Sequence, residues 1–131
     1  MPIKRMKFIS RAFVKEHPEW CFVFGDNEMR QGFGGQAAAM RGEPNSIGVA
    51  TKVSPGTNEG AYWSDNHFLD HVIQLCSDFQ MVQDELDLET VVVIPSDGLG
   101  TGLSELPKRA PATLAFIEQV IAYIEKTYGV S

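Results

Sequence analysis

Cysteine, histidine and positive charge are scarce in this sequence, and long apolar segments are missing. Its 131 residues include 2 Cys and 3 His, and 17 acidic residues outnumber 11 basic ones, for a net charge of −6. A membrane-spanning helix needs about 20 consecutive apolar residues, and no segment approaches that length. The basic residues 1–7 lack the apolar core of a signal peptide. We therefore expect a soluble, cytoplasmic protein without a membrane partner.

The cysteines and the net charge each exclude a class of protein. Cys21 lies in an apolar segment and Cys76 on an apolar helix face, so we expect buried thiols in a reducing compartment rather than a disulfide. An acidic surface repels long polyanions, which excludes duplex nucleic acid as a partner on bulk charge. A small nucleotide held by backbone amides is compatible with this charge. The sequence does not indicate the oligomeric state.

The remaining composition is that of one globular domain over residues 1–131. Hydrophobic residues make up 44% of the chain and charged residues 21%, and a chain of this length buries roughly two-thirds of its unfolded surface. Apolar strand patterns alternate with helical periodicity, which predicts an α/β fold: a three-layer sandwich with a mostly parallel central sheet. We expect strands at residues 3–9, 20–24, 46–52 and 91–95, and helices at 11–16, 36–41, from Ser64 or Asp65 to at least Phe79, and 111–128.

Capping residues support these helix ends. Ser10 is a typical N-cap for the first helix, and Gly42 follows the second in the position of a C′ glycine. Pro111 suits the first turn of the last helix, which Gly129 ends. An acidic linker at residues 84–89 is expected to lead into the strand at 91–95.

Residues 20–42 contain the most informative pattern of the chain. An apolar strand is followed by the turn Gly25-Asp26-Asn27, a glycine loop at residues 32–35 and a helix start at Gln36. Glycine lets a backbone approach a ligand closely, and the free N–H groups of a first helical turn favour an anion. The pattern predicts a phosphate or diphosphate site, with an ordinary tight connection as the alternative.

A dinucleotide fingerprint is a second interpretation of this loop. Gly32, Gly34 and Ala37 fit G-x-G-x-x-A. In a Rossmann site, however, the first glycine follows the strand directly, whereas here residues 25–31 intervene. The next strand also ends at Lys52 and not at the acid that would hold a ribose. We therefore expect a phosphate cradle of a different kind.

A second glycine-rich loop, residues 96–103, follows the strand at residues 91–95. That strand is apolar without alternation, which is typical of a parallel strand covered on both faces. The carboxyl ends of parallel strands meet at one sheet edge, so the two loops are expected to lie together. Their pairing predicts a nucleotide or phosphosugar ligand.

Two blocks of the sequence resemble the macro domain family. The first is FVFGDN at residues 22–27 with GFGGQAA at 32–38, and the second is VIPSDGLGTGLSELP at 93–107. The resemblance covers about two-thirds of the chain and is closest to short, divergent macro-like proteins of bacteria and bacteriophages. It implies binding of ADP-ribose, and some family members hydrolyse ADP-ribosyl bonds or an ADP-ribose phosphate.

The resemblance also implies roles for individual residues. Asn27 would bond the distal ribose, Gly34 and Gly35 would approach it, and the second loop would cradle the diphosphate. The expected ligand-binding residues are Gly25, Gly32, Gly34, Gly35, Gln36, Ser96, Gly98, Leu99, Gly100, Thr101 and Gly102. Two residues depart from the family pattern: Gln36 replaces an acid, and the Asp97 carboxylate stands near the expected phosphates.

Asp26 and Asn27 are the candidate catalytic residues. Asp26 follows a buried strand and would orient a water for attack at the anomeric carbon of the ribose; the alternative is that it caps its own turn. Asn27 offers a donor and an acceptor to a diol, with a structural turn as the alternative.

Further polar and aromatic residues have two interpretations each. His67 and His71 have the spacing of a metal pair, but no third ligand is evident, so we expect helix-terminal or surface histidines and neither a metal nor a cofactor. Trp63 is expected in the core, whereas Tyr62 and Phe33 would stack on a base. Lys52 is expected to contact either a phosphate or only water. The loop at residues 53–60 lies beside the expected site and could act as a lid.

Three functional hypotheses follow from these residues and the resemblance. The first is an ADP-ribose-recognising domain that hydrolyses an ADP-ribosyl derivative at the distal ribose. The second is a non-catalytic binder of ADP-ribose or a related nucleotide, because the loops contain no His-Asp or Cys-His pair. The third is a phosphatase for an ADP-ribose phosphate. In each case the partner is ADP-ribose or an ADP-ribosylated molecule.

Overall fold

A sheet of four parallel strands forms the centre of the molecule. The computed structural model describes residues 2–131. The strands β1 (Ile3–Met6), β2 (Cys21–Asp26), β3 (Ser46–Ala50) and β4 (Val92–Pro95) pair in the order β1-β4-β2-β3. All three strand pairings are parallel. The predicted α/β class and parallel sheet are confirmed, with β1 at an edge of the sheet.

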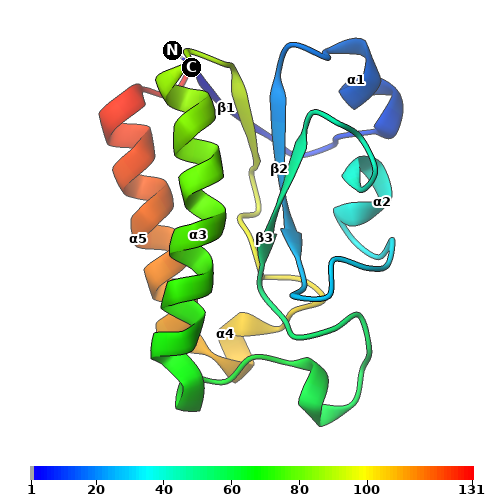
Figure 1. Cartoon of the computed structure of the whole chain (residues 1–131), viewed down its shortest axis with the longest axis vertical. Coiled ribbons are helices and arrows are strands. Elements are labelled where there is room, and N and C mark those ends of the chain that lie inside the picture. Colours follow the sequence, from blue (N-terminus) through cyan, green and yellow to red (C-terminus); the bar gives the residue numbers. More distant parts are fainter. Residues whose placement is uncertain (1) are drawn as a thin grey trace.

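Helices cover both faces of the sheet. Figure 1 shows α3 (Phe68–Asp87) and α5 (Pro111–Tyr128) on one side, and α1 (Arg11–Glu16) and the single turn α2 (Ala37–Met40) on the other. The short α4 (Leu106–Arg109) precedes α5. Alternate residues of β2 supply two separate cores: Val23 packs with the α3 and α5 side, and Phe22 with the α1 and α2 side. Three layers therefore enclose a sheet that is buried on both faces.

The predicted capping residues occupy the expected positions. The Ser10 hydroxyl accepts a hydrogen bond from a backbone N–H of the first turn of α1 at 3.1 Å. Gly42, after α2, and Gly129, after α5, have φ angles of +92° and +96°, a conformation that favours glycine. Pro111 is the first residue of α5, where no N–H is needed.

Several predicted boundaries are wrong. β2 continues through Gly25 and Asp26, and β3 ends at Ala50. α3 starts later than expected because Ser64 precedes a separate 3₁₀ turn, η2 (Asp65–His67). The Asp65 carboxylate instead accepts N–H bonds from the first turn of α5. The expected acidic linker is largely helical, since α3 runs through Asp87.

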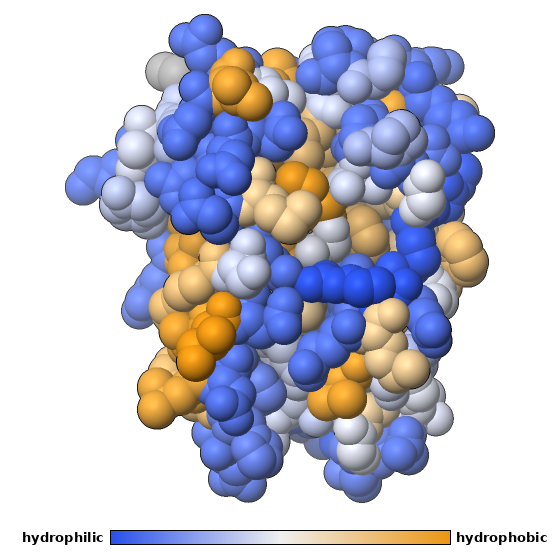
Figure 2. All heavy atoms as spheres, in the orientation of Figure 1, coloured by the Kyte–Doolittle hydropathy of each residue, from blue (hydrophilic) through white to orange (hydrophobic). Residues whose placement is uncertain are grey.

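The spacing of Phe68, Val72, Leu75, Cys76 and Phe79 in the sequence predicts that they form the face of α3 that packs on the sheet, and the observed buried face agrees only for Leu75 and Phe79. Its buried side chains are His71, Leu75, Asp78, Phe79, Val82 and Leu86. Cys76 is exposed, contrary to the expectation of a buried thiol, whereas Cys21 is buried as predicted. Exposed apolar side chains, including Leu69 and Ile73, lie on the outer face of α3, and Figure 2 shows apolar groups gathered over its lower part. Among residues 2–131, no helix has both the length and the apolar character of a membrane span.

Candidate ligand-binding site between two glycine loops

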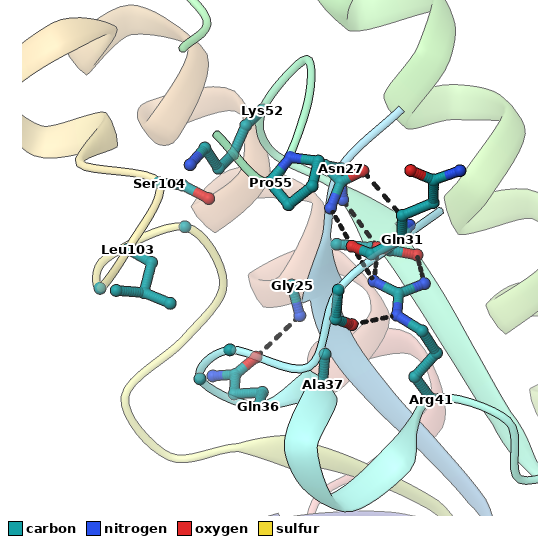
Figure 3. A pocket seen from close by; sticks show the side chains of 16 residues that line it. Gly25, Asn27, Gln31, Gln36, Ala37, Arg41, Lys52, Pro55, Leu103 and Ser104 are labelled. Atoms are coloured by element: carbon teal, nitrogen blue, oxygen red, sulfur yellow. Dashed lines mark hydrogen bonds and ion pairs between the residues drawn. The ribbon is translucent and has the colours of Figure 1, made fainter. Parts of the chain in front are cut away.

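A pocket of about 150 Å³ opens at the carboxyl edge of the sheet. β2 and β4 are parallel neighbours, so the loops that follow them meet there. Figure 3 shows that both loops contribute to the wall. The lining residues are Gly25, Asp26, Asn27, Gln31, Gly32, Gly34, Gly35, Gln36, Ala37, Arg41, Lys52, Pro55, Gly100, Gly102, Leu103 and Ser104.

Both loops present backbone N–H groups without a partner in the chain. Within the described residues, the N–H groups of residues 99–104 and of residues 32–36 donate to no backbone or side-chain acceptor. Gly98 and Gly100 have φ angles of +84° and +83°, and Gly32 of +92°. Successive free N–H groups in such a conformation form a concavity that binds anions.

Gln36 connects the two loops. Its Oε1 accepts a hydrogen bond from the backbone N–H of Gly25 at 2.7 Å, and its Nε2 donates to the carbonyl oxygen of Gly98 at 3.1 Å. A carboxylate could make the first bond but not the second, because it has no proton to donate. The Gln36 amide therefore links β2 and the first loop to the second loop.

Asp26 is held by two arginines. Its side chain is about 3% exposed; one oxygen pairs with Arg41, and the other lies 3.3 Å from Arg30 Nη1. Oδ1 also accepts the backbone N–H of Asn27 at 2.8 Å. Both carboxylate oxygens are thus engaged by the protein. This geometry favours the structural alternative for Asp26, and its role as a general base stays a prediction.

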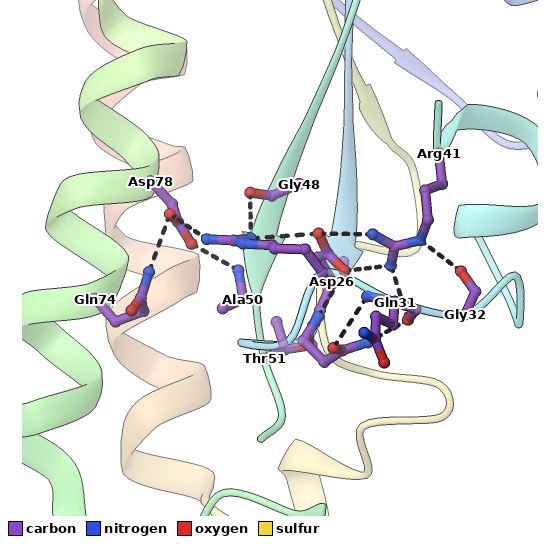
Figure 4. A network of polar contacts seen from close by, with 12 residues as sticks. Asp26, Gln31, Gly32, Arg41, Gly48, Ala50, Thr51, Gln74 and Asp78 are labelled. Atoms are coloured by element: carbon purple, nitrogen blue, oxygen red, sulfur yellow. Dashed lines mark hydrogen bonds and ion pairs between the residues drawn. The ribbon is translucent and has the colours of Figure 1, made fainter. Parts of the chain in front are cut away.

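The ion pairs of Asp26 belong to a larger network (Figure 4). Arg30 Nη2 donates to Asp78 Oδ1 on α3 at 2.7 Å, and Asp78 Oδ2 accepts the backbone N–H of Ala50 at 2.8 Å. Arg41 Nε donates to the carbonyl oxygen of Gly32 at 2.5 Å. Two arginines and two aspartates therefore join the first glycine loop to α2, β3 and α3.

The sequence analysis missed Arg30, Arg41 and Asp78. One signal was available: a carboxylate buried at the end of a strand is usually paired with a cation, and Arg30 and Arg41 are the first two basic residues after Asp26 in the chain. Nothing in the sequence identified Asp78, which lies about fifty residues away on a helix face predicted to be apolar.

Asn27 lines the pocket and also stabilises its own loop. Its Nδ2 donates to the carbonyl oxygen of Gln31 at 2.8 Å, and its Oδ1 lies 3.5 Å from the Gln31 backbone nitrogen. The second distance is at the limit of a hydrogen bond. Oδ1 therefore retains capacity to accept a bond from a ligand or a water.

Four predicted ligand-binding residues lie outside this pocket: Ser96, Gly98, Leu99 and Thr101. Leu99 is buried in the core, and the Thr101 hydroxyl donates to the carbonyl oxygen of Asp97 at 2.9 Å. These residues and Asp97 border a separate hollow against α5. Asp97 is therefore not among the pocket residues, where its charge would oppose a phosphate.

The aromatic candidates divide between core and surface. Trp63 is buried, as predicted, and its indole N–H donates to Glu28 at 2.8 Å. His71 lies in the first turn of α3, as one of the two expected alternatives has it, but it is buried and stacks on Trp63 with a centroid distance of 4.1 Å, so it is not a surface histidine. Phe33 is exposed and does not line the pocket. Among residues 2–131, no group of three or more His, Cys, Asp or Glu side chains is placed to hold a metal ion.

Comparison with known proteins identifies the family. A family model described as "Family of unknown function (DUF7831)" matches residues 4–120. The chain belongs to this family. No curated protein and no solved structure matches the chain. Because membership in DUF7831 carries no function, the functional argument depends on the chemistry of the pocket.

Proposed function

We propose that this DUF7831 protein is a macro-like domain that binds ADP-ribose, or the ADP-ribosyl group of a modified molecule. One observation carries the proposal: in both loops, residues that line the pocket have backbone N–H groups without a partner among the described residues, namely residues 32 and 34–36 in the first loop and residues 100 and 102–104 in the second. Two facing sets of amides suit a diphosphate, whose charge is spread over several oxygens. The resemblance of both glycine blocks to the macro pattern supports the same ligand.

The size of the pocket fits part of this ligand. A volume of about 150 Å³ is below the roughly 300 Å³ that encloses a drug-sized molecule, so it suits the distal ribose and a phosphate. A neighbouring hollow of about 510 Å³ shares Gly35 and Gln36 with the pocket and is also lined by the exposed Phe8 and by Asp97, whose carboxylate would lie near the nucleotide there. The rest of the nucleotide would extend in that direction.

Binding and hydrolysis are separate proposals. Binding requires only the amides and the shape of the pocket. Hydrolysis of an ADP-ribosyl bond is the second candidate, favoured by Asn27 Oδ1, whose one bond within the chain is 3.5 Å long and which could orient a water. The ion pairs of Asp26 support a binder over an enzyme that uses this carboxylate as its base.

The test is isothermal titration calorimetry with ADP-ribose, using AMP, NAD and ribose 5-phosphate as controls. Gly102 lines the pocket, and a Cβ there would meet no atom within 4 Å, so Gly102→Glu places a negative charge at the site without a clash. Gly60→Glu adds the same charge outside the pocket and is the matched control.

We expect ADP-ribose to bind more tightly than the three controls, and Gly102→Glu to weaken it at least tenfold while Gly60→Glu leaves it unchanged. Equal affinity in both variants would show that the ligand lies elsewhere. Absence of heat with ADP-ribose would refute the proposed ligand. Release of free ADP-ribose from an ADP-ribosylated peptide, measured by chromatography, would separate the hydrolase from the binder.

A further inference from the structure

Lys52 is a buried cation without an acidic partner. It follows β3, lines the pocket and is only 7% exposed. Its Nζ donates to the carbonyl oxygen of Gly56 at 2.9 Å, and among residues 2–131 no carboxylate oxygen lies within 4.0 Å of it. An ammonium group has three donors, so two remain unused by the chain. Burying a charge without a counter-ion is costly unless a ligand supplies one.

The acidic residues near Lys52 are already paired with another cation. Arg109 forms ion pairs of 3.0 Å with both Glu59 and Glu105. Arg109 and Lys52 both lie over the ring of Tyr62, at 3.7 Å and 4.4 Å from its centroid. The pKa of Lys52 is lowered, mainly because the side chain is buried. The charge of Glu105 raises this pKa, and the charge of Arg109 lowers it. An anion at Nζ would oppose the effect of burial.

Ser104 lines the same pocket as Lys52 (Figure 3). The Thr51 hydroxyl donates to the carbonyl oxygen of Asp26 at 3.1 Å, so in its hydrogen bond with Ser104 the Ser104 hydroxyl is the donor. The Ser104 backbone N–H, in contrast, has no partner among the described residues. Ser104 therefore offers the pocket its backbone N–H and not its hydroxyl proton.

We propose that the ammonium group of Lys52 and the backbone N–H of Ser104 form an oxyanion subsite in the pocket. It would bind a phosphate or carboxylate that the ligand carries beyond its diphosphate. The subsite lies in the proposed ADP-ribose pocket, so the identity of its biological ligand rests on the proposed function. Its affinity for a simple oxyanion does not. The corresponding substrate class is an ADP-ribose derivative with an anionic group on the distal ribose.

The first experiment uses inorganic phosphate alone, titrated at constant ionic strength and followed by NMR of the backbone amides. Lys52→Met keeps the length of the side chain and removes its charge, and Lys126→Met removes the same charge from an exposed position on α5. We expect Lys52→Met to weaken phosphate binding at least tenfold and Lys126→Met to leave it unchanged. A parallel titration with acetate distinguishes a phosphate subsite from a carboxylate subsite.

A structural role for Lys52 is tested in the same samples. If Lys52 only holds the loop at Gly56, Lys52→Met will lower the melting temperature and leave phosphate binding unchanged, which would overturn the subsite. Lys52→Gln is the second variant should Lys52→Met not fold, and we expect it to weaken phosphate binding at least tenfold. Absence of phosphate binding by the unmodified protein would also overturn the proposal.

A second experiment separates this inference from the proposed function. ADP-ribose and its derivative phosphorylated on the distal anomeric carbon are titrated into the unmodified protein and Lys52→Met. We expect the phosphorylated ligand to bind at least tenfold more tightly than ADP-ribose, and this advantage to disappear in Lys52→Met. Lys52-dependent binding of phosphate without any binding of ADP-ribose would refute the proposed function and retain the subsite. Equal affinities of the two ligands would overturn the subsite and retain the function.

Discussion

Gly48 and Asp26 illustrate how a side chain, and not a backbone angle, can require glycine. Gly48 of β3 pairs with Phe24 of β2, two residues before Asp26, and its φ angle is not in the left-handed region. A Cβ atom at position 48 would overlap the Asp26 carboxylate, which two arginines hold in place. The absence of a side chain at Gly48 therefore makes room for the ion-pair network.

We expect Gly48→Ala to lower the free energy of unfolding by about 1–3 kcal/mol, the usual cost of overpacking a rigid site. Alanine is otherwise no less stabilising than glycine in a strand. A lower stability of Gly48→Ala would therefore be caused by the overlap with Asp26. Urea denaturation measures the effect, and Gly60→Ala is the control because the nearest atom to its new Cβ would be 3.6 Å away. Stability equal to that of the unmodified protein would mean that the Asp26 carboxylate can move aside.

Gln36 provides a second test at the residue scale. Gln36→Glu keeps the acceptor for the Gly25 N–H but places a carboxylate against the Gly98 carbonyl oxygen, which the amide now satisfies at 3.1 Å. We expect a loss of about 1–3 kcal/mol in the free energy of unfolding, the cost of an unsatisfied buried group, and weaker binding of ADP-ribose. Gln119→Glu makes the same charge change on the exposed face of α5. Similar stabilities for the two variants would contradict the bridging role of Gln36.

At the scale of elements, α3 shows where periodicity predicts structure and where it fails. The apolar positions Leu75 and Phe79 correctly indicated the face that packs on the sheet. His71 and Asp78 lie on the same buried face, where hydropathy alone would not place them. Each is there because a specific partner from another element satisfies it: Trp63 and the Ser64 carbonyl for His71, and Arg30 for Asp78.

The burial of His71 predicts a pH dependence. Burial lowers the pKa of His71 below its ordinary value of 6.5; the hydrogen bond with the Ser64 carbonyl and the charges of Glu28 and Asp70 raise it, and His67 lowers it. The unfolded chain therefore binds the proton more readily than the folded one. The contribution of His71 to stability is present above about pH 6.5 and is lost as the pH falls below it.

Urea unfolding between pH 7.5 and pH 5 tests this expectation. His71→Phe retains a ring to stack on Trp63 but cannot be protonated, so we expect a smaller loss of stability on acidification than in the unmodified protein. His67→Phe, at an exposed position, should leave the pH dependence nearly unchanged. If the curves of the unmodified protein and His71→Phe run parallel, His71 does not control this acid sensitivity.

At the scale of the whole molecule, the layers of the fold could be predicted from the sequence, but the ion-pair network around Asp26 could not. The continuous apolar character of residues 91–95 correctly predicted a strand covered on both faces, and the glycines predicted which loops meet at the sheet edge. The pairing of Arg30 with Asp78 was not predictable, because it depends on how α3 crosses β3. Likewise, the position of Asp97 outside the pocket is set by the turn after β4.

Ligand binding should stabilise the whole molecule because the pocket joins segments that are distant in the chain. Its walls come from the loops after β2 and β4, with Lys52 after β3. A ligand that binds only the folded state at 100 times its dissociation constant adds about 2.7 kcal/mol to the free energy of unfolding. For a domain of this size we expect ADP-ribose to raise the melting temperature by roughly 5–15 °C, as measured by calorimetry. Gly60→Glu should show the same increase and Gly102→Glu almost none. An equal increase in both variants would place the ligand outside the pocket.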